Sequence, residues 1–429
     1  MTAEIAVMNK NGIALAADSA VTITGATGQK IYDTHKLFML SKYHPVGVMI
    51  FGNAEILGVP WQVIIKEFRK KQLGKTPYPT LQEYGDRFIG YLTNNNKYFP
   101  PERQREFFIE VVSEIFAHIN EEITENVREI TRKGKITQSQ AISIIKKHIE
   151  DFYQTVLPLE NLTTLPKGSF RSILKTYKNE INEKIQQYFP FLKPTDSLSR
   201  VLRRISALIF IKNTFDIVKN YSGVVIAGFG DDEIYPGVIE YNIDSVINNR
   251  LKYFVRENTA VSQRLPAAVI PFAQHEMVYS FMEGISPAYQ ITMQEYLRVL
   301  FTNYPKEIIK QITGLDTKSK NALLKKMNNA TNGLIEQFVS EVRKWARTNN
   351  VNPILGTVAF LPLEELASMA ESLVNLTSFK RRVTMEAETV GGPIDVAVIS
   401  KGDGFIWINR KHYFDAKYNP HFLANYYRE

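Results

Sequence analysis

Residues 1–19 constrain the fold of this chain more than any other segment. Residues 2–8 and 13–17 are mostly apolar and flank the turn sequence Asn9-Lys10-Asn11-Gly12. This pattern predicts an antiparallel hairpin in which the Asn-Gly pair supplies a positive φ. With the turn centred on its two middle residues, facing residues have numbers that sum to about 21. The hairpin therefore brings Asp18 beside Thr2, because paired Cβ atoms lie ~5 Å apart.

The second residue of the chain has the chemistry of a nucleophile. Thr2 directly follows Met1, and we expect Met1 to be removed because the next side chain is small. A threonine at the N-terminus carries a hydroxyl and a free amine, so nucleophile and base belong to one residue. We therefore expect Thr2 to be a catalytic nucleophile.

The composition is that of a globular protein. The chain has 429 residues, which predicts two or three domains, or one domain with a large insertion. The absence of cysteine excludes thiolate chemistry, and the seven histidines show no metal-ligand spacing, so we expect no metal and no cofactor. No apolar run approaches the ~18 residues of a membrane span, and the N-terminus lacks a secretory signal. We expect a cytoplasmic protein that does not bind membranes.

Two strand-rich ends enclose helices in the expected organisation. The strands expected after the N-terminal hairpin are 37–41, 45–51, 223–228, 238–243, 267–270, 394–399 and 405–409. The expected helices cover about 54 to 71, 81–220, 274–350 and 363–376. The chain then divides into an N-terminal core part, a helical insertion, central core strands, a second helical insertion and a C-terminal core part with an aromatic tail: 1–75, 76–220, 221–288, 289–350 and 351–429.

Positive charge is concentrated in the first helical insertion. Residues 126–220 contain 17 Lys or Arg and 8 Asp or Glu, which gives a local charge of +9 against +8 for the whole chain. Such a segment can bind an anionic or acidic partner, although long helices with a solvated basic face give the same pattern. No nucleic-acid-binding motif accompanies it, so we do not expect nucleic acid as a partner.

Several motifs together resemble a known family. They are Thr2, the hairpin ending in Ala16-Ala17-Asp18-Ser19, the triplet Lys36-Leu37-Phe38 and the strand ending in Gly52-Asn53-Ala54. In this order they resemble the N-terminal half of proteasome β-type subunits and their bacterial ring-protease relatives, which are N-terminal-nucleophile hydrolases. Segments 223–229, 237–244, 363–376 and 391–399 resemble later parts of the same family. The resemblance implies an α+β fold, a four-layer αββα sandwich, here with a large central helical insertion.

The resemblance also implies the roles of individual residues. Thr2 is the nucleophile, Lys36 the cation that lowers the pKa of its amine, and Asp18 the carboxylate that holds Lys36. The backbone N–H of Gly52 is expected to stabilise the oxyanion. Substrate contacts are expected at three further positions: Thr22, whose backbone binds substrate as an added strand, Ile50 and Ala54.

Two supporting positions of the family have different residues here. The family's serine after a central strand corresponds to the segment 270–274, which has no serine, and Gln274 is the expected substitute. The family's aspartate before the late Gly-Gly is absent, and Glu388 or Glu386 takes its place, with Glu388 our choice as the catalytic residue.

These features predict a threonine-type peptidase that cleaves peptide or amide bonds. We expect a polypeptide or amide substrate, assembly into a homo-oligomer, and a regulatory or unfoldase partner. Two alternatives stay open. One is a small-molecule amidase of the same superfamily. The other is a non-catalytic scaffold or regulatory protein that binds a partner through its basic helical insertion.

Overall fold

The computed structural model describes residues 2–25, 28–95, 97–218, 220–314, 316–384, 391–412, 414–421 and 424. At 22–25, 28–31, 133 and 416 it describes the backbone alone. The chain divides into two compact units. Unit 1 contains Met1–Leu37, Ile234–Pro236 and Ala260–Glu429, and unit 2 contains Phe38–Glu233 and Gly237–Thr259.

Unit 1 is built on a five-stranded sheet with the order β12-β1-β2-β13-β14, in which every neighbouring pair is antiparallel. Its strands are β1 (Ala3–Asn9), β2 (Gly12–Ala17), β12 (Ala267–Ala273), β13 (Asp395–Ser400) and β14 (Gly404–Asn409). A separate two-stranded sheet follows β2 and comprises β3 (Ala20–Gly25) and β4 (Gly28–Asp33).

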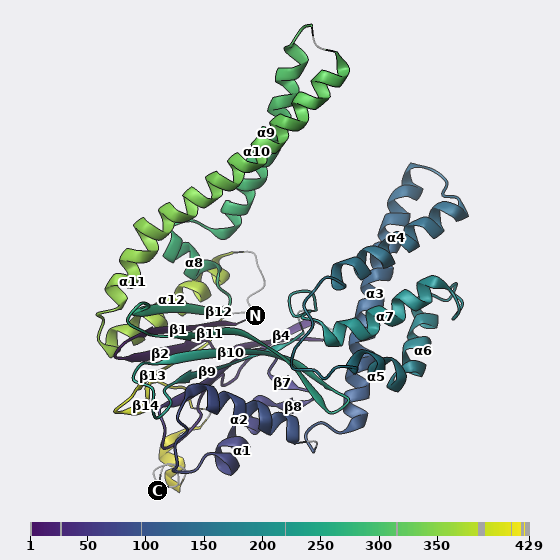
Figure 1. Cartoon of the computed structure of the whole chain (residues 1–429). Helices are drawn as coiled ribbons and strands as arrows, with labels where there is room; N and C mark the ends of the chain where they lie inside the picture. The colour runs from purple at the N-terminus through teal and green to yellow at the C-terminus, as the bar shows by residue number, and fades with distance from the viewer. Residues whose placement is uncertain are drawn as a thin grey trace. The chain divides into compact units, whose positions relative to one another are not determined.

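Helices cover one face of this sheet. Unit 1 contains the helices α8 (Glu276–Glu283), α9 (Pro287–Gln311), α10 (Thr317–Ala346), α11 (Asn352–Val358) and α12 (Leu363–Val383), with a π-helical turn (Arg347–Val351) before α11. Of these, α8, α11 and α12 contribute to the buried cluster on the sheet. Alternate residues of β1 and β2, such as Ile5 and Ala14, pack with Leu366 and Ala370 of α12 in one buried cluster. Small alanines on β2 let the helix approach the sheet closely. The helical hairpin of α9 and α10 extends away from the sheet (Figure 1).

The hairpin register predicted from the sequence is confirmed. Glu4 lies opposite Ala17, and the Asp18 N–H donates to the Ala3 carbonyl oxygen at 3.1 Å. The predicted turn conformation is wrong, because neither Asn11 nor Gly12 has a positive φ. The Asn9 carboxamide accepts the Asn11 N–H instead, at 2.8 Å. Glycine is required at position 12 because a Cβ there would lie 2.5 Å from the Ile399 carbonyl oxygen.

Unit 2 contains the second five-stranded sheet, with the order β11-β10-β9-β6-β5. Its strands are β5 (Leu37–Met39), β6 (Val46–Gly52), β9 (Ser222–Gly228), β10 (Gly237–Ile247) and β11 (Arg250–Ala260). Helices α1 (Trp61–Gln72) and α2 (Leu81–Asn94) share one apolar cluster with these strands. The large buried rings of that cluster include Trp61, Phe68 and Phe88.

A helical cluster forms the rest of unit 2 and confirms the helices predicted for 81–220. It comprises α3 (Pro101–Lys133), α4 (Gln138–Val156), α5 (Ser169–Thr176), α6 (Lys178–Tyr188) and α7 (Ser197–Ile211). The cluster has its own core, in which the ring of Phe108 stacks on Tyr177 at 4.0 Å and on Phe210 at 4.9 Å between centroids.

Two local predictions in unit 2 are wrong. The helix expected from Ala54 begins at Trp61, because the small hairpin of β7 (Glu55–Ile56) and β8 (Val59–Pro60) precedes it. The hairpin of β10 and β11 was missed. Its turn residues Asn248 and Asn249 have φ values of 51° and 56°, the left-handed pair that a tight hairpin turn requires and asparagine tolerates.

The mixed α+β class is therefore confirmed. The packing of the two sheets into a four-layer sandwich stays a prediction, since each sheet belongs to its own unit, and so does the five-part domain division. Among the described residues, no helix is both long enough and apolar enough to cross a membrane.

Glu240 of β10 should make stability depend on pH. Burial raises the pKa of this carboxyl from 4.5 to about 7, with Arg256 opposing the rise and Glu257 adding to it. The unfolded chain ionises near pH 4.5 and the folded chain near 7, so unfolding releases a proton between these values. Stability should therefore fall as pH rises from about 4.5 to 7, by up to about 3 kcal/mol. Denaturant unfolding across this range measures it.

Glu240→Gln should remove this part of the pH dependence. Glu125→Gln, which changes an exposed carboxyl of α3, is the matched control and should leave the pH dependence as in the wild type. Equal pH slopes for wild type and Glu240→Gln would contradict the assignment.

Candidate active site

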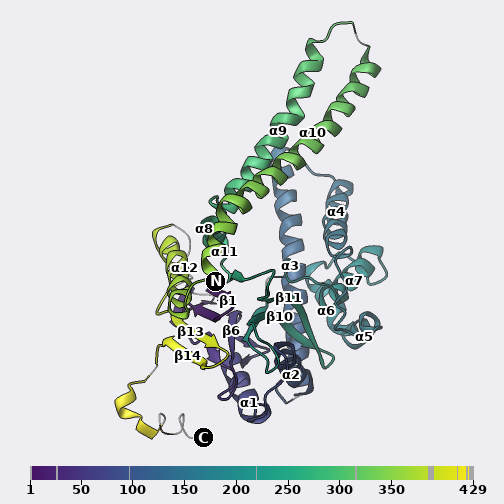
Figure 2. The ribbon, with the colours of Figure 1, turned by 60° about the vertical axis from the view of Figure 1, so that its left-hand side comes forward.

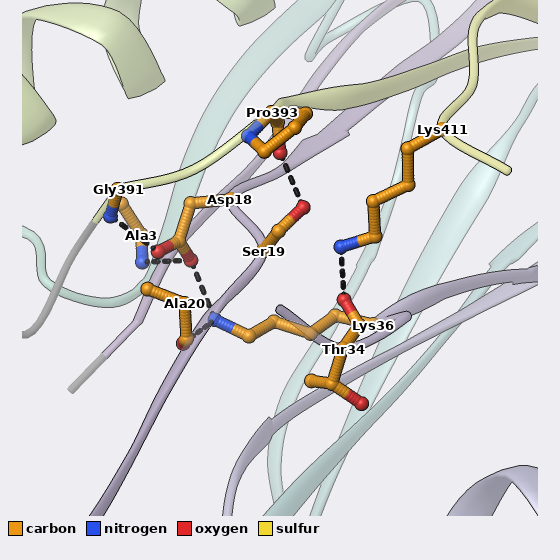
Figure 3. A network of polar contacts seen from close by, with 9 residues as sticks. All are labelled: Ala3, Asp18, Ser19, Ala20, Thr34, Lys36, Gly391, Pro393 and Lys411. Atoms are coloured by element: carbon orange, nitrogen blue, oxygen red, sulfur yellow. Dashed lines mark hydrogen bonds and ion pairs between the residues drawn. The ribbon is translucent and has the colours of Figure 1, made fainter. Parts of the chain in front are cut away.

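The candidate site lies where β1 begins and β2 ends, and it is centred on the Asp18 carboxylate. Oδ1 of Asp18 accepts the Ala3 N–H at 3.0 Å and the Lys36 ammonium at 2.7 Å. Oδ2 accepts the Gly391 N–H at 3.0 Å. These donors converge on the carboxylate from three segments of unit 1 (Figure 3). Each oxygen of the carboxylate therefore accepts at least one hydrogen bond.

Lys36 and Asp18 form a fully buried ion pair. Their side chains are 3% and 0% exposed. Lys36 also donates to the Ala20 carbonyl oxygen at 2.6 Å. A buried ammonium is tolerated only when it is paired and hydrogen-bonded. The site therefore holds a fixed positive charge that shares a carboxylate oxygen with the backbone N–H next to Thr2.

Thr2 has an unusual environment for a threonine. The residue is 3% exposed, and its Oγ1 atom is buried without a hydrogen-bond partner among the described residues. Its carbonyl oxygen accepts the Gln274 N–H at 3.1 Å. A buried hydroxyl that makes no hydrogen bond costs free energy, and a functional role is one of the recognised explanations for such a group.

The strand that flanks Thr2 ends in strained backbone. Ala273 of β12 lies opposite Ala3 and has a φ of 60°, which costs an L-residue other than glycine roughly 1–2 kcal/mol. The next residue, Gln274, accepts a hydrogen bond from Arg381 of α12 at 2.6 Å. The Gln274 backbone contacts Thr2, while the role of the Gln274 side chain as a substitute for the family's serine stays a prediction.

The segment that leads into β13 closes one side of the site. The Gly391 carbonyl oxygen accepts the N–H groups of Ser19 and Ala20, at 3.1 and 3.0 Å. The Ser19 hydroxyl donates to the Pro393 carbonyl oxygen. Residues 385–390 precede this segment, so Glu386 and Glu388 lie outside the described residues, and their roles stay predictions.

A second lysine supports the loop that carries Lys36. Lys411, after β14, donates through its ammonium to the Thr34 carbonyl oxygen (Figure 3). Its backbone N–H donates to Oδ1 of Asp395 at 2.8 Å. Burial lowers the pKa of Lys411, and the Asp395 carboxylate opposes this effect. Sequence reasoning missed both Lys411 and Arg381, since neither stands in a motif and both are far from residues 2–36 in the sequence.

The remaining predicted residues are distributed over both units. Thr22 lies in β3 of unit 1, opposite Ile31 of β4. Gly52, Ile50 and Ala54 belong to unit 2, where Ile50 is buried in β6 and the other two are exposed. Gly52 has a φ of 76°, and a Cβ there would lie 2.3 Å from the Tyr221 carbonyl oxygen. The structure therefore brings together Thr2, Asp18 and Lys36. In the described part of the chain, no group of three acidic or histidine side chains could hold a metal ion.

Comparison with known proteins gives only distant likenesses. No protein-family model and no curated protein matches the chain. Among solved structures, a Gly-1 mutant of Anbu from Hyphomicrobium sp. strain MC1 is 9% identical, with 100% of this chain and 98% of that chain covered. The helical assembly of the Anbu complex from Pseudomonas aeruginosa and Anbu (ancestral beta-subunit) from Yersinia bercovieri are 10% and 11% identical, each covering 99% of this chain and 93% of theirs.

These comparisons correct the family assignment. The TM-score of all three structures is 0.27, which is too low to show a shared fold. The assignment to the proteasome β-subunit family, made from residues 2–54 and the later segments, is therefore wrong, and what remains is a remote likeness to Anbu structures. Function has to be judged from the chemistry of the site.

The Asp18–Lys36 pair should dominate local stability. Asp18→Asn leaves the Lys36 ammonium buried without its counter-charge and should lower the free energy of unfolding by about 3–5 kcal/mol. Asp415→Asn is the matched control, since Asp415 pairs with Lys417 at the surface at 3.0 Å, and such pairs contribute about 1 kcal/mol or less. Chemical denaturation of both variants measures the difference. Equal, small losses would show that Lys36 is not buried as a charge.

Proposed function

We propose that this protein is a hydrolase of peptide or other amide bonds whose nucleophile is Thr2, exposed as the N-terminus by removal of Met1. The observation that carries the proposal is the buried hydroxyl of Thr2, which has no hydrogen-bond partner among the described residues. The next residue, Ala3, donates its N–H to the same Asp18 oxygen that accepts the buried Lys36 ammonium. A nucleophile, a fixed cation and an oriented carboxylate are the groups that acyl transfer by an N-terminal threonine requires.

The first step uses the hydroxyl and the α-amine of Thr2. Thr2 Oγ attacks the substrate carbonyl carbon, and the α-amine of the same residue takes the hydroxyl proton, directly or through a water. The acyl group is then bound to Thr2 as an ester, and the proton passes to the leaving amine. Water, activated by the same amine, hydrolyses the ester and restores the hydroxyl.

Lys36 tunes this chemistry electrostatically. An α-amine has an ordinary pKa of roughly 7.7–8.0, and a nearby ammonium lowers it because positive charge disfavours the protonated amine. The same charge stabilises the alkoxide character that develops on Oγ. Asp18 holds Lys36 in place and, through the Ala3 N–H, fixes the backbone next to the nucleophile.

Substrate binding is the less constrained part of the proposal. In the described part of the chain, β3 pairs with β4 on one edge only. An extended peptide can then add as a strand along the other edge of β3, at Thr22. The roles expected for Gly52, Ile50 and Ala54, which belong to unit 2, and for Glu388, which lies outside the described residues, stay predictions.

Thr2→Ala should abolish turnover. After intact-mass measurement shows loss of Met1, the variant should lower kcat for fluorogenic peptides by at least about 10³-fold. Thr2→Ser keeps a hydroxyl nucleophile and should retain measurable activity. Thr155→Ala on α4 is the control and should behave as wild type. Retention of Met1, or turnover that survives Thr2→Ala, would contradict the proposal.

The same assay separates the alternative functions. Turnover of small amides but not of peptides would identify a small-molecule amidase. If folded protein that lacks Met1 hydrolyses neither class of amide, a scaffold or regulatory role is favoured.

Removal of the Lys36 charge should move the pH profile. The double variant Lys36→Met/Asp18→Asn leaves no unpaired charge in the site. Without the ammonium the pKa of the Thr2 amine rises, so the acid limb of the kcat/KM profile should move to higher pH by roughly one unit. Asp415→Asn should leave the limb unchanged. An unchanged limb in the double variant would show that Lys36 does not act on the amine.

A further inference from the structure

The helical hairpin of unit 1 exposes more apolar surface than its own packing covers. Helices α9 and α10 contact each other as an antiparallel pair (Figure 2). Pro305 and Ile309 of α9, and Thr331 and Ile335 of α10, are buried between them. Much of the rest of α9 is apolar too. A helix that is apolar on several faces is normally buried on several faces, so the described part of a single chain lacks a partner for this surface of α9.

The uncovered face of α9 is a continuous stripe. Five large side chains recur at spacings of three and four residues, the period of one helix face. Each of them is between 39% and 73% exposed. They are Tyr289, Met293, Tyr296, Leu300 and Tyr304.

The neighbouring helix continues this surface. Tyr304 precedes the buried Pro305 by one residue, and on α10 the exposed Leu334 precedes the buried Ile335 in the same way. In an antiparallel helix pair, such positions of the two helices lie on the same side. With large side chains offering roughly 200 Å² each, the stripe exposes roughly 600 Å². Leu334 and Phe338 bring the total near the ~800 Å² per partner of a stable interface.

The apolar residues of the stripe keep nearly the same spacing when the direction of α9 is reversed. Reversal of α9 about the midpoint between Tyr296 and Leu297 exchanges Tyr289 with Tyr304 and Met293 with Leu300. Glu295 and Arg298, the two charged residues between positions 289 and 304, lie about 140–160° around the helix from the stripe, on the opposite side of α9. A surface of this kind meets itself across a two-fold axis, with apolar groups against apolar groups.

Charge at the tip of the hairpin sets the direction of pairing. The tip carries six lysines against Glu307 and Asp316: Lys306, Lys310, Lys318, Lys320, Lys325 and Lys326. Parallel pairing would bring two such tips together and would be opposed by repulsion. Antiparallel pairing directs the tips away from each other.

We propose that α9 is a homodimer interface, through which the hairpins of two copies of this chain pair antiparallel about a two-fold axis at Tyr296. Met293 of each copy then packs against the partner's Leu300. The interface is independent of the proposed hydrolase activity.

Complementary charges introduced into the stripe give a direct test on the full chain. Sedimentation velocity over about 1–100 µM should show a dimer or a larger even-numbered assembly for the wild type. Met293→Glu and Leu300→Lys each place a charge in the apolar interface and should raise the dissociation constant of the pair at least about 10-fold. A mixture of the two variants places the introduced carboxylate opposite the introduced ammonium and should form heterodimers. Loss of helix stability within one copy could not be rescued in this way.

Glu295→Arg is the matched control, because Glu295 is exposed and lies on the side of α9 opposite the stripe. It should leave the mass unchanged. A monomeric wild type at all concentrations would overturn the proposal and assign the stripe to a different protein or a lipid surface. An oligomer that Met293→Glu does not weaken, or variants that stay apart when mixed, would overturn it as well.

Discussion

The buried ion pair between Asp18 and Lys36 is the interaction on which the candidate site depends. It joins the end of β2 to the loop after β4, and through the same carboxylate it fixes the first residue of β1 and the segment before β13. A charge pair with almost no solvent access is stable only while both partners and their hydrogen bonds are present. Its geometry is therefore rigid, and Thr2 is held at its edge by the adjacent Ala3 N–H. Rigid placement of a cation near a nucleophile is what makes electrostatic tuning of that nucleophile effective.

Local sequence pattern predicted the part of the site that depends on one hairpin. The register of β1 and β2 follows from two apolar runs and a short turn, and it alone places Asp18 beside the start of the chain. The details of the turn could not be read in the same way, because contact with Ile399, distant in the sequence, decides why residue 12 is glycine. The hairpin at Asn248-Asn249 was missed because its turn contains neither glycine nor proline, and its positive φ values fall on asparagine.

Long-range contacts set the limit of sequence reasoning elsewhere in the site. Arg381 and Lys411 reach it from the end of α12 and from beyond β14, and a single charged residue in those positions has no distinguishing pattern. The motifs in residues 2–54 led to an incorrect family assignment, because short motifs specify a local hairpin and its charges rather than a whole fold. What survives the comparisons is the chemistry of three residues, Thr2, Asp18 and Lys36, which the structure of unit 1 brings together.

Covalent labelling of Thr2 tests the central claim most directly. An epoxyketone peptide reacts with the hydroxyl and the free amine of an N-terminal threonine, so it requires both groups that the mechanism uses. After incubation, intact-mass and peptide-map spectrometry should find one adduct per chain, located on Thr2 of protein that has lost Met1, and none on Thr2→Ala. An unlabelled wild type, or an adduct that persists in Thr2→Ala, would contradict the assignment of Thr2 as the nucleophile.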